Sequence, residues 1–547
     1  MPLPPQTKYI VGNEACERFS FYGMRSILTL YLTVVLAMSE QAAVTVGHLF
    51  NACIYVLPLF GAWLADRFLG RYRMILYVSL FYCLGHGVLA TADLTDSIEM
   101  RRLILFLGLF IIALGAGGIK PCVSAFVGDQ VEEGESHTMT RIYAAFYWSI
   151  NLGSFFSFLI IPWVRQTWGY SWAFAIPGIF MALATIIFWK GRKLYRHRRP
   201  SQPEFFPILA HLLWRGRTRS EAQHGAEPVQ RTLTTLCHIL IFLLSAVVLG
   251  LFLWALTSLS AELITRLGGS KTAASLASLV TLLAGLAGAL LIALKLSAAK
   301  GAQNTLGMVG SMLYQGAAAA SARYAADKLR ETRNLLRILV VFLLIIPFWS
   351  LYDQTMTSWV LQGDKMQAIH FGTAESGTLF TFGAEEMQSF NPLLVMILVP
   401  LVTLLIYPRI GKWGSPLRRM GCGIVLAGIS YGAVAGIQMA LDAGMGLSIL
   451  WQCLPYLLLT ISEILVSTTG LEYAYTAAGS NLKSIISGFW FLTSTLGNFL
   501  VIYLTHLVSD PASVSTFVMY GALSVFFGLL FLYVTTRPAM KAEATRP

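Results

Sequence analysis

The sequence predicts an all-α polytopic membrane protein. Of its 547 residues, 56% are apolar and only 12% are charged, whereas soluble proteins usually carry about 25% charged residues. Apolar stretches long enough to cross a bilayer recur along the chain, and most basic residues lie between them. The net charge of +12 therefore indicates an orientation in the membrane. It does not predict nucleic-acid binding, because no basic domain with interleaved aromatic residues is present.

Fourteen candidate spans follow one another in groups of six, two and six. The first six lie at 13–38, 44–64, 74–92, 103–128, 142–164 and 172–189, and the two extra ones at 233–256 and 272–296. The last six lie at 338–360, 391–407, 420–441, 449–477, 484–507 and 516–534.

This grouping predicts three parts. An N-terminal six-helix bundle occupies residues 1–190, and a basic cytoplasmic linker with the two additional helices occupies 191–337. A C-terminal six-helix bundle with a short cytoplasmic tail occupies 338–547. The Ala-rich segment 297–337 inside the linker is compatible with an amphipathic surface helix or with a long connection.

The distribution of basic residues predicts the orientation. If the N-terminus is inside, the loops on the inner side contain most of the Lys and Arg residues, at 67–73, 190–199, 328–337 and 409–419. The outer loops contain few, with Arg101 and Arg102 as the main exception. The positive-inside rule therefore places both termini in the cytoplasm. We expect no cleavable signal peptide, and the seven scattered cysteines form neither a disulfide framework nor a metal site.

A charged stripe marks the first span. In a helix, Glu14, Glu17, Arg18, Tyr22 and Arg25 share one face, because they are spaced by three and four residues. Each charge in a span costs about 2.5–3.5 kcal/mol and usually faces a bundle interior or a water-filled cavity. The stripe therefore indicates a polar pathway. An ion pair that only fixes helix packing is the alternative.

Two isolated charges extend this interpretation. Lys120 is a lone cation just before Pro121, and Glu463 lies deep in the tenth apolar stretch. Each needs an opposite charge or a bound ligand nearby. A zwitterionic peptide supplies both, with a carboxylate for Arg25 and Lys120 and an ammonium group for Glu463. The distance between the two poles would then limit the length of the peptide.

Motifs for enzymes and for nucleotide-driven pumps are missing. The segment 428–432 fits the G-x-S-x-G pattern of a nucleophile elbow, but it lies inside an apolar helix and not at a strand–turn–helix junction. The spacing of Gly428, Gly432 and Gly436 instead suits close helix packing. No zinc-protease motif or phosphate-binding loop occurs. We therefore expect no enzymatic activity, no cofactor and no ATP hydrolysis.

One loop resembles a large transporter superfamily. Residues 61–71, GAWLADRFLGR, lie between the second and third spans and are similar to the inner-loop signature G-x-x-x-D-R-x-G-R of the major facilitator superfamily. The resemblance implies that superfamily's fold, which consists of two six-helix bundles, here with an additional helix pair between them.

Five further segments resemble the proton-dependent oligopeptide transporter family within that superfamily. They are EACERFSFY at 14–22, GAGGIKP at 115–121, FWSLYDQ at 348–354, FNP at 390–392 and SEILVS at 462–467. The extra helix pair is similar to the fourteen-helix prokaryotic members. The large extracellular domain of the animal members is missing, since only residues 442–446 stand in its place.

The resemblance implies roles for particular residues. Proton coupling and gating would involve Glu14, Glu17, Arg18, His48, Lys120, Asp353 and Glu463. The peptide site would include Tyr22, Arg25, Tyr55, Lys120, Tyr147, Asn151, Trp349, Asn391, Glu463, Ser467 and Trp490. The aromatic residues are individually also compatible with packing, and the Asn391-Pro392 pair with a simple kink.

Three positions depart from the usual pattern or vary within the family. Phe21 replaces the first tyrosine of a pair, Asp353 is shorter than the usual glutamate, and only some members have a histidine at the position of His48. A gating pair of Asp353 with His48 or Arg25 and a merely structural histidine both remain open at this stage.

We expect a symporter that imports di- and tripeptides with protons by alternating access. It would act as a functional monomer in the lipid bilayer of the bacterial cytoplasmic (inner) membrane, driven by the proton gradient without a cofactor, and would bind no nucleic acid. The nearest rival is the same fold carrying another anionic solute such as nitrate. Glu14, Glu17 and Glu463 argue against this rival, and a non-transporting receptor stays possible.

Overall fold

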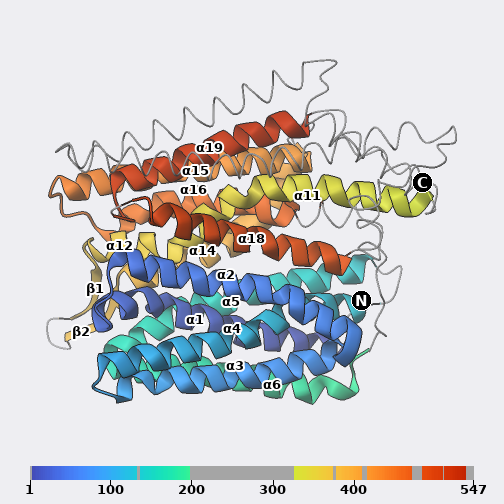
Figure 1. The fold of residues 1–547 in the computed structure, drawn as a ribbon, viewed down its shortest axis with the longest axis horizontal. Coiled ribbons are helices and arrows are strands. Elements are labelled where there is room, and N and C mark those ends of the chain that lie inside the picture. The colour runs from blue at the N-terminus through green and yellow to red at the C-terminus, as the bar shows by residue number, and fades with distance from the viewer. Residues whose placement is uncertain are drawn as a thin grey trace, which may run out of the picture.

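The computed structural model describes residues 3–131, 136–196, 326–373, 377–409, 415–470, 473, 483–508 and 510–536. Long helices run side by side along one direction (Figure 1). The predicted extra helices at 233–256 and 272–296, and most of the linker around them, lie outside the described residues.

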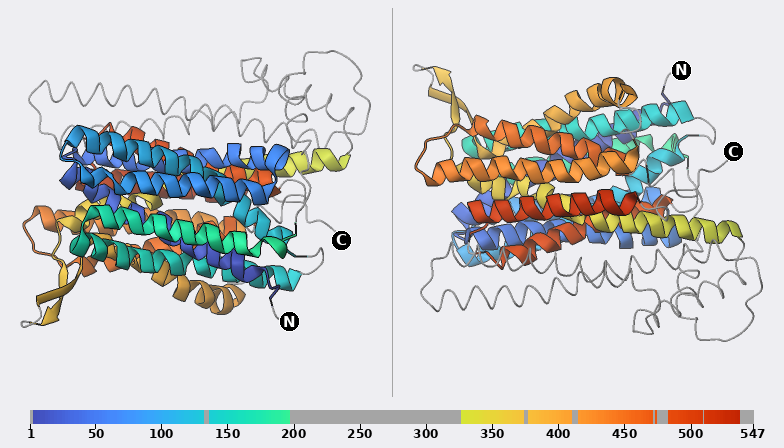
Figure 2. Two further views of the ribbon diagram at one scale, coloured as in Figure 1. Left: turned by 90° about the horizontal axis from the view of Figure 1, so that it is seen from below. Right: turned by 90° about the horizontal axis from the view of Figure 1, so that it is seen from above.

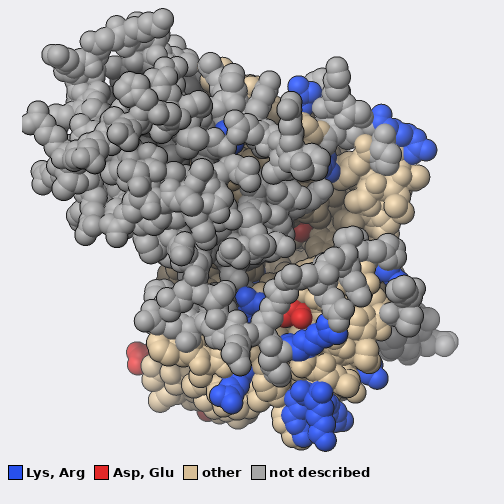
Figure 3. Space-filling model, turned by 90° about the vertical axis from the view of Figure 1, so that its right-hand side faces the viewer, with Lys and Arg blue, Asp and Glu red and all other residues tan. Residues whose placement is uncertain are grey.

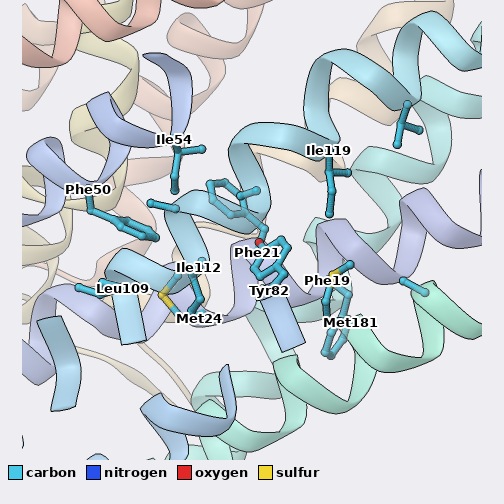
Figure 4. Close-up of a cluster of buried hydrophobic side chains, with 14 of the residues drawn as sticks. Phe19, Phe21, Met24, Phe50, Ile54, Tyr82, Leu109, Ile112, Ile119 and Met181 are labelled. Carbon is cyan, nitrogen blue, oxygen red and sulfur yellow. The ribbon is translucent and has the colours of Figure 1, made fainter. Parts of the chain in front are cut away.

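The N-terminal half contains six long helices. They are α1 (Thr7–Leu30), α2 (Glu40–Leu64), α3 (Arg71–Ala90), α4 (Ile98–Asp129), α5 (Ser136–Trp168) and α6 (Tyr170–Lys190). Buried apolar side chains from these helices form one core. Figure 4 shows Phe21 of α1 and Tyr82 of α3 close to Ile112 of α4 inside this core.

The C-terminal half has its own core. Its helices are α11 (Ala326–Tyr352), α12 (Ser358–Asp364), α13 (Ala384–Met387), α14 (Phe390–Leu401), α15 (Pro416–Asp442), α16 (Cys453–Glu463), α18 (Lys483–Thr505) and α19 (Val514–Thr535). Most buried apolar residues of this second core come from these helices. Helix α2 of the first half packs along α18 of the second, as Figure 1 shows.

The described helices agree with the predicted spans. Ten of them are long and apolar enough to cross a membrane. The first two predicted spans are also helices, α1 and α2, although neither is among these ten. Helix α1 contains Glu14, Glu17, Arg18 and Arg25, and these charges reduce its hydropathy. The chain is therefore a polytopic helical membrane protein.

Three spans are interrupted near polar residues. The seventh breaks where α11 ends, and a short turn, η5 (Asp353–Met356), leads into α12. The tenth contains a wider turn, η10 (Ile464–Thr468), directly after Glu463. Such irregular turns inside helices are frequent at functional sites. The eighth is interrupted between α13 and α14, so Asn391-Pro392 lies in the first turn of α14 and does not kink its middle.

The segment between the seventh and eighth spans forms a small hairpin. Strands β1 (Ile369–Thr373) and β2 (Gly377–Phe382) pair antiparallel, and Figure 2 shows that they project from one end of the bundle. Helix α1 begins at the opposite end (Figure 1). The expectation of a purely helical chain missed this hairpin, because the composition of the segment carries no clear strand pattern.

The predicted glycine stripe on α15 is only partly correct. A Cβ atom on Gly428 would lie 2.6 Å from the carbonyl oxygen of Gly521 on α19. Gly432 and Gly436, in contrast, have no heavy atom within 4 Å of such a Cβ. Of these three glycines, only Gly428 packs closely against α19, whereas Gly432 and Gly436 are exposed.

Basic side chains gather at one end of the bundle. Figure 3 looks onto the end where α1 begins, and Lys and Arg side chains gather on the part of this face that is not grey. Exposed basic residues at this end include Arg73 in the first turn of α3, and Arg192 and Lys193 after α6. The hairpin lies at the opposite end.

Candidate functional site

A cavity lies between the two halves of the chain. Its volume is about 170 Å³, far more than the roughly 10–15 Å³ that a single water needs on the same measure. Side chains from α1 and α5 line one side, and side chains from α11, α14 and α16 line much of the other. Seven of the predicted peptide-site residues line it: Tyr22, Tyr147, Asn151, Trp349, Asn391, Glu463 and Ser467.

Glu463 is the acidic group of this cavity. Its Oε2 accepts a hydrogen bond from Nδ2 of Asn391 at 2.9 Å, and the same amide donates to Oγ1 of Thr460 at 3.0 Å. The Tyr352 hydroxyl donates to Oδ1 of Asn391 at 3.3 Å. Asn391 thereby holds the carboxylate in place. No basic residue forms an ion pair with Glu463 in the described part of the chain, so a bound cation can fill that role.

Aromatic rings form a wall beside Glu463. Trp349 lines the cavity, and Trp490 packs edge-on behind it, with ring centroids 5.8 Å apart. Trp490 itself does not line the cavity. Its predicted role in the peptide site stays a prediction.

The charged stripe on α1 forms a compact buried cluster. Nε of Arg18 lies 2.8 Å from Oε1 of Glu14 and 2.6 Å from Oε2 of Glu17. Glu17 is fully buried, and neither of its carboxylate oxygens has a hydrogen-bond partner with acceptable geometry, despite the short distance to Arg18. The cluster is thus held by charge and poorly satisfied by hydrogen bonds.

Lys120 is held by aromatic rings. Its Nζ lies 4.1 Å from the ring centre of Phe21 and 4.1 Å from that of Tyr55, which are favourable cation–π distances. Lys120 is within electrostatic reach of Glu14, Glu17 and Asp353 but forms no direct ion pair with a described residue. Phe21 stands where the family usually has a tyrosine. It has no hydroxyl, and it contacts Lys120 through the face of its ring.

Arg25 and Lys120 do not line the cavity, and neither does Tyr55. The Arg25 side chain is buried, lies over the Phe21 ring at 5.6 Å, and acts electrostatically on Asp353. Tyr55 stacks on Phe491 of α18 at 6.0 Å. The residues predicted to bind the peptide carboxylate, Arg25 and Lys120, therefore do not line the cavity in this structure. Glu463, which is predicted to bind the peptide amine, does line it.

His48 and Asp353 do not contact each other directly, as a gating pair would. Asn498 of α18 lies between them. Its Oδ1 is 2.7 Å from Nδ1 of His48, and its Nδ2 donates to Oδ2 of Asp353 at 2.7 Å. In this structure the two predicted gating residues are instead joined through the amide of Asn498.

Further polar contacts join the two halves near the hairpin. Arg165 of α5 forms an ion pair with Glu385 of α13 at 2.6 Å, and Nε2 of Gln166 donates to Oε1 of Glu386 at 2.9 Å. Gln41 of α2 donates to the carbonyl of Thr505 on α18 at 2.8 Å. These contacts close the halves against each other at the hairpin end.

Sequence reasoning missed several residues of these networks. Tyr352 lies inside the quoted 348–354 segment, next to Asp353, so its position was a usable signal. Asn498 is an amide inside an apolar helix, and such residues usually have a polar partner in the bundle. The contacts of Arg165 with Glu385 had no signal, since their 220-residue separation appears only after folding.

Two helical halves with a polar cavity between them and buried charges beside it define a membrane transporter of the kind that alternates between two openings. Three comparisons agree with this class. A protein-family sequence model described as "POT family" matches residues 72–523. The chain belongs to the POT family.

Solved structures and curated relatives give the same result. A structure described as an auto-inhibited POT family peptide transporter is 36% identical, with a TM-score of 0.72 over 100% of this chain and 99% of that one. The POT family transporter PepTSo is 34% identical, with a TM-score of 0.73 over 98% of this chain and 99% of that one.

Among the relatives, "Solute carrier family 15 member 2" of Mus musculus is 30% identical over 459 residues, covering 80% of this chain and 49% of the mouse protein. "Peptide transporter family 1" of Drosophila melanogaster is 30% identical over 452 residues, covering 81% of this chain and 48% of the fly protein. The chain thus spans about half the length of these curated relatives.

Proposed function

We propose that this protein is a symporter that imports di- and tripeptides together with protons. The observation that carries the proposal is the cavity between the halves, which contains Glu463 without a basic partner among the described residues. A carboxylate without a basic partner inside a membrane protein attracts an ammonium group. A peptide amine at Glu463 fits this site, whereas nitrate or another small anion would be repelled by it. The relatives named as peptide transporters support the same substrate class.

The proton would bind in the cluster of Glu14, Glu17 and Arg18. Burial favours the neutral form of a carboxylic acid, and the neighbouring arginine favours the charged form. A movement of Arg18 away from Glu17 would therefore favour protonation of Glu17. Lys120 lies within electrostatic reach of both acids, so it can take part in the exchange of charge partners.

The available driving force is sufficient. One pH unit supplies about 1.4 kcal/mol per proton, and a potential of about 100 mV supplies roughly 2.3 kcal/mol per charge. The sum of roughly 3.7 kcal/mol supports an accumulation of several hundred-fold for one proton per neutral peptide. No cofactor is required by this scheme.

The contacts at the hairpin end suggest which side is closed. We place the basic end on the cytoplasmic side of a bacterial inner membrane, because it carries Arg73, Arg192 and Lys193. Both termini would then be cytoplasmic, and the Arg165–Glu385 pair would close the outer side. Each half contributes residues to one cavity within a single chain, so a monomer suffices.

Uptake into liposomes tests the proposal. Purified protein in liposomes should accumulate labelled dialanine when the outside is more acidic, and a protonophore should abolish the accumulation. Liposomes without protein provide the control. Uptake no higher than in these liposomes, under an imposed proton gradient, would refute peptide symport. Gradient-driven uptake of nitrate in place of dialanine would favour the rival substrate.

A further inference from the structure

The amide of Asn498 makes four hydrogen bonds, and two of them cross from the C-terminal half to the N-terminal half. Its Oδ1 lies 2.7 Å from Nδ1 of His48 and accepts from Nδ2 of Asn51 at 3.1 Å. Its Nδ2 donates to Oδ2 of Asp353 at 2.7 Å and to the carbonyl of Ser494 at 2.8 Å. The oxygen thus faces α2 of the N-terminal half, and the nitrogen faces the C-terminal half.

The orientation of this amide follows from its partners. A backbone carbonyl can only accept a hydrogen bond, so the nitrogen of Asn498 must face Ser494. The oxygen must then face His48, and Nδ1 of His48 must carry a hydrogen in order to donate to it. In the neutral ring, Nε2 can accept from the Thr357 hydroxyl, which lies 3.0 Å away. Asn498 therefore determines which nitrogen of His48 is protonated.

The network is buried and surrounded by few charges. His48, Asn51, Asn498 and Asp353 are each at most 4% exposed. The charged or titratable groups that act on it electrostatically are Arg25 from α1, Lys120 from α4, Tyr55 from α2, and Tyr352 and Tyr431 from the C-terminal half. Hydrogen bonds in such a site polarise one another.

We propose that Asn498 is a positioning residue that transmits the protonation of Asp353 to His48 across the interface between the halves. The inference rests on the proposed proton-coupled function. When Asp353 is ionised, the charge-assisted bond from Nδ2 polarises the amide and strengthens acceptance by Oδ1. When Asp353 binds a proton, the hydrogen bond between Oδ1 of Asn498 and Nδ1 of His48 weakens. The contact between α2 and α18 weakens as a result.

A thermodynamic cycle tests the transmission without any transport measurement. Melting temperatures are measured for Asp353→Asn, His48→Gln and the double variant, first with Asn498 present and then with Asn498→Leu. With Asn498 present, Asp353→Asn shifts the melting temperature by some amount. This shift should differ by about 2 °C or more between the protein with His48 and the His48→Gln variant. With leucine at this position, the two substitutions should be additive. Additivity in both backgrounds would overturn the proposal.

Uptake supplies a readout that a merely structural role would not change. Asn498→Leu should reduce gradient-driven accumulation of dialanine about tenfold or more, as expected for the loss of a charge-assisted hydrogen bond. Its pH dependence should flatten, while peptide exchange without a gradient persists. The matched control is Thr495→Val, because Thr495 lies on the same helix and interface and bonds only to backbone carbonyls of Ala52 and Phe491. The control should keep both activities.

If the leucine variant does not fold, Asn498→Ala replaces it in both experiments, since alanine is too short to reach His48 and Asp353. A folded Asn498 variant with the pH profile and accumulation of the wild type would overturn the proposal. Absence of uptake by the wild type itself would refute peptide symport, and the melting cycle would still decide the role of Asn498.

Discussion

Glu17 is the residue on which proton coupling depends most directly in this proposal. It is fully buried, 2.6 Å from Arg18, and its carboxylate oxygens lack hydrogen-bond partners. Glu17→Gln keeps the shape of the side chain but cannot exchange a proton. We expect gradient-driven accumulation of dialanine to be lost, while peptide exchange, which needs no net proton movement, persists.

Thermal stability and peptide binding of the Glu17→Gln protein provide the control, because Arg18 without its partner could instead disturb the fold. A folded variant that still concentrates peptide under an inward proton gradient would show that Glu17 is not required. The proton site would then have to be sought at Glu14, His48 or Asp353.

The charged ends of the peptide are predicted to be recognised separately. Glu463 lines the cavity and is held by Asn391, so N-acetylation of dialanine should weaken binding by about 1.5–3 kcal/mol, or tenfold or more. Competition with labelled dialanine uptake measures this loss. If free dialanine and N-acetylated, C-amidated dialanine competed equally well, recognition of both the amine and the carboxylate of the peptide would be refuted.

The carboxylate pole needs its own test, because Lys120 does not line the cavity in this structure. Lys120→Ala should weaken dialanine binding if the rings of Phe21 and Tyr55 release Lys120 when a peptide is present. Unchanged affinity and unchanged transport would exclude Lys120 from the site and leave it as a structural cation.

At the level of the elements, glycines allow α15 and α19 to pack closely, and Gly428 is one of them. A Cβ on Gly428 would lie 2.6 Å from the carbonyl oxygen of Gly521 and 3.0 Å from the amide nitrogen of Val525. Since both are backbone atoms, Gly428→Val should separate the helices and cost about 1–3 kcal/mol or more.

Melting curves in detergent measure this effect. Gly432→Ala on the same helix is the matched control, because a Cβ there meets nothing within 4 Å and alanine favours the helix by roughly 0.5–1 kcal/mol. We expect a lower melting temperature for Gly428→Val and an equal or higher one for Gly432→Ala. The same melting temperature for both variants would contradict the packing argument.

For the whole molecule, the basic residues gathered at one end predict the orientation in the membrane. On a background without native cysteines, His370→Cys on the exposed strand β1 should react with an impermeant reagent added outside intact cells. Lys193→Cys, exposed at the basic end, should react only after the membrane is opened. Labelling of Lys193→Cys from outside would refute the cytoplasmic location of the basic loops.

The sequence by itself determined the helical class, the order of the spans and the family. Hydropathy and the distribution of Lys and Arg depend on local composition, and family motifs are local strings. Glu14, Glu17 and Arg18 could be placed together for the same reason, since helical spacing fixes which residues share a face.

Only the tertiary structure decided which residues meet across the halves. His48 and Asn498 are 450 positions apart, and Asp353 and Asn498 are 145 apart, so no local pattern relates them. The structure also separated Lys120 from the cavity and placed Trp490 behind Trp349. These outcomes depend on helix rotation and on how closely helices approach each other. Packing of whole side-chain surfaces sets both, and single-residue chemistry does not predict them.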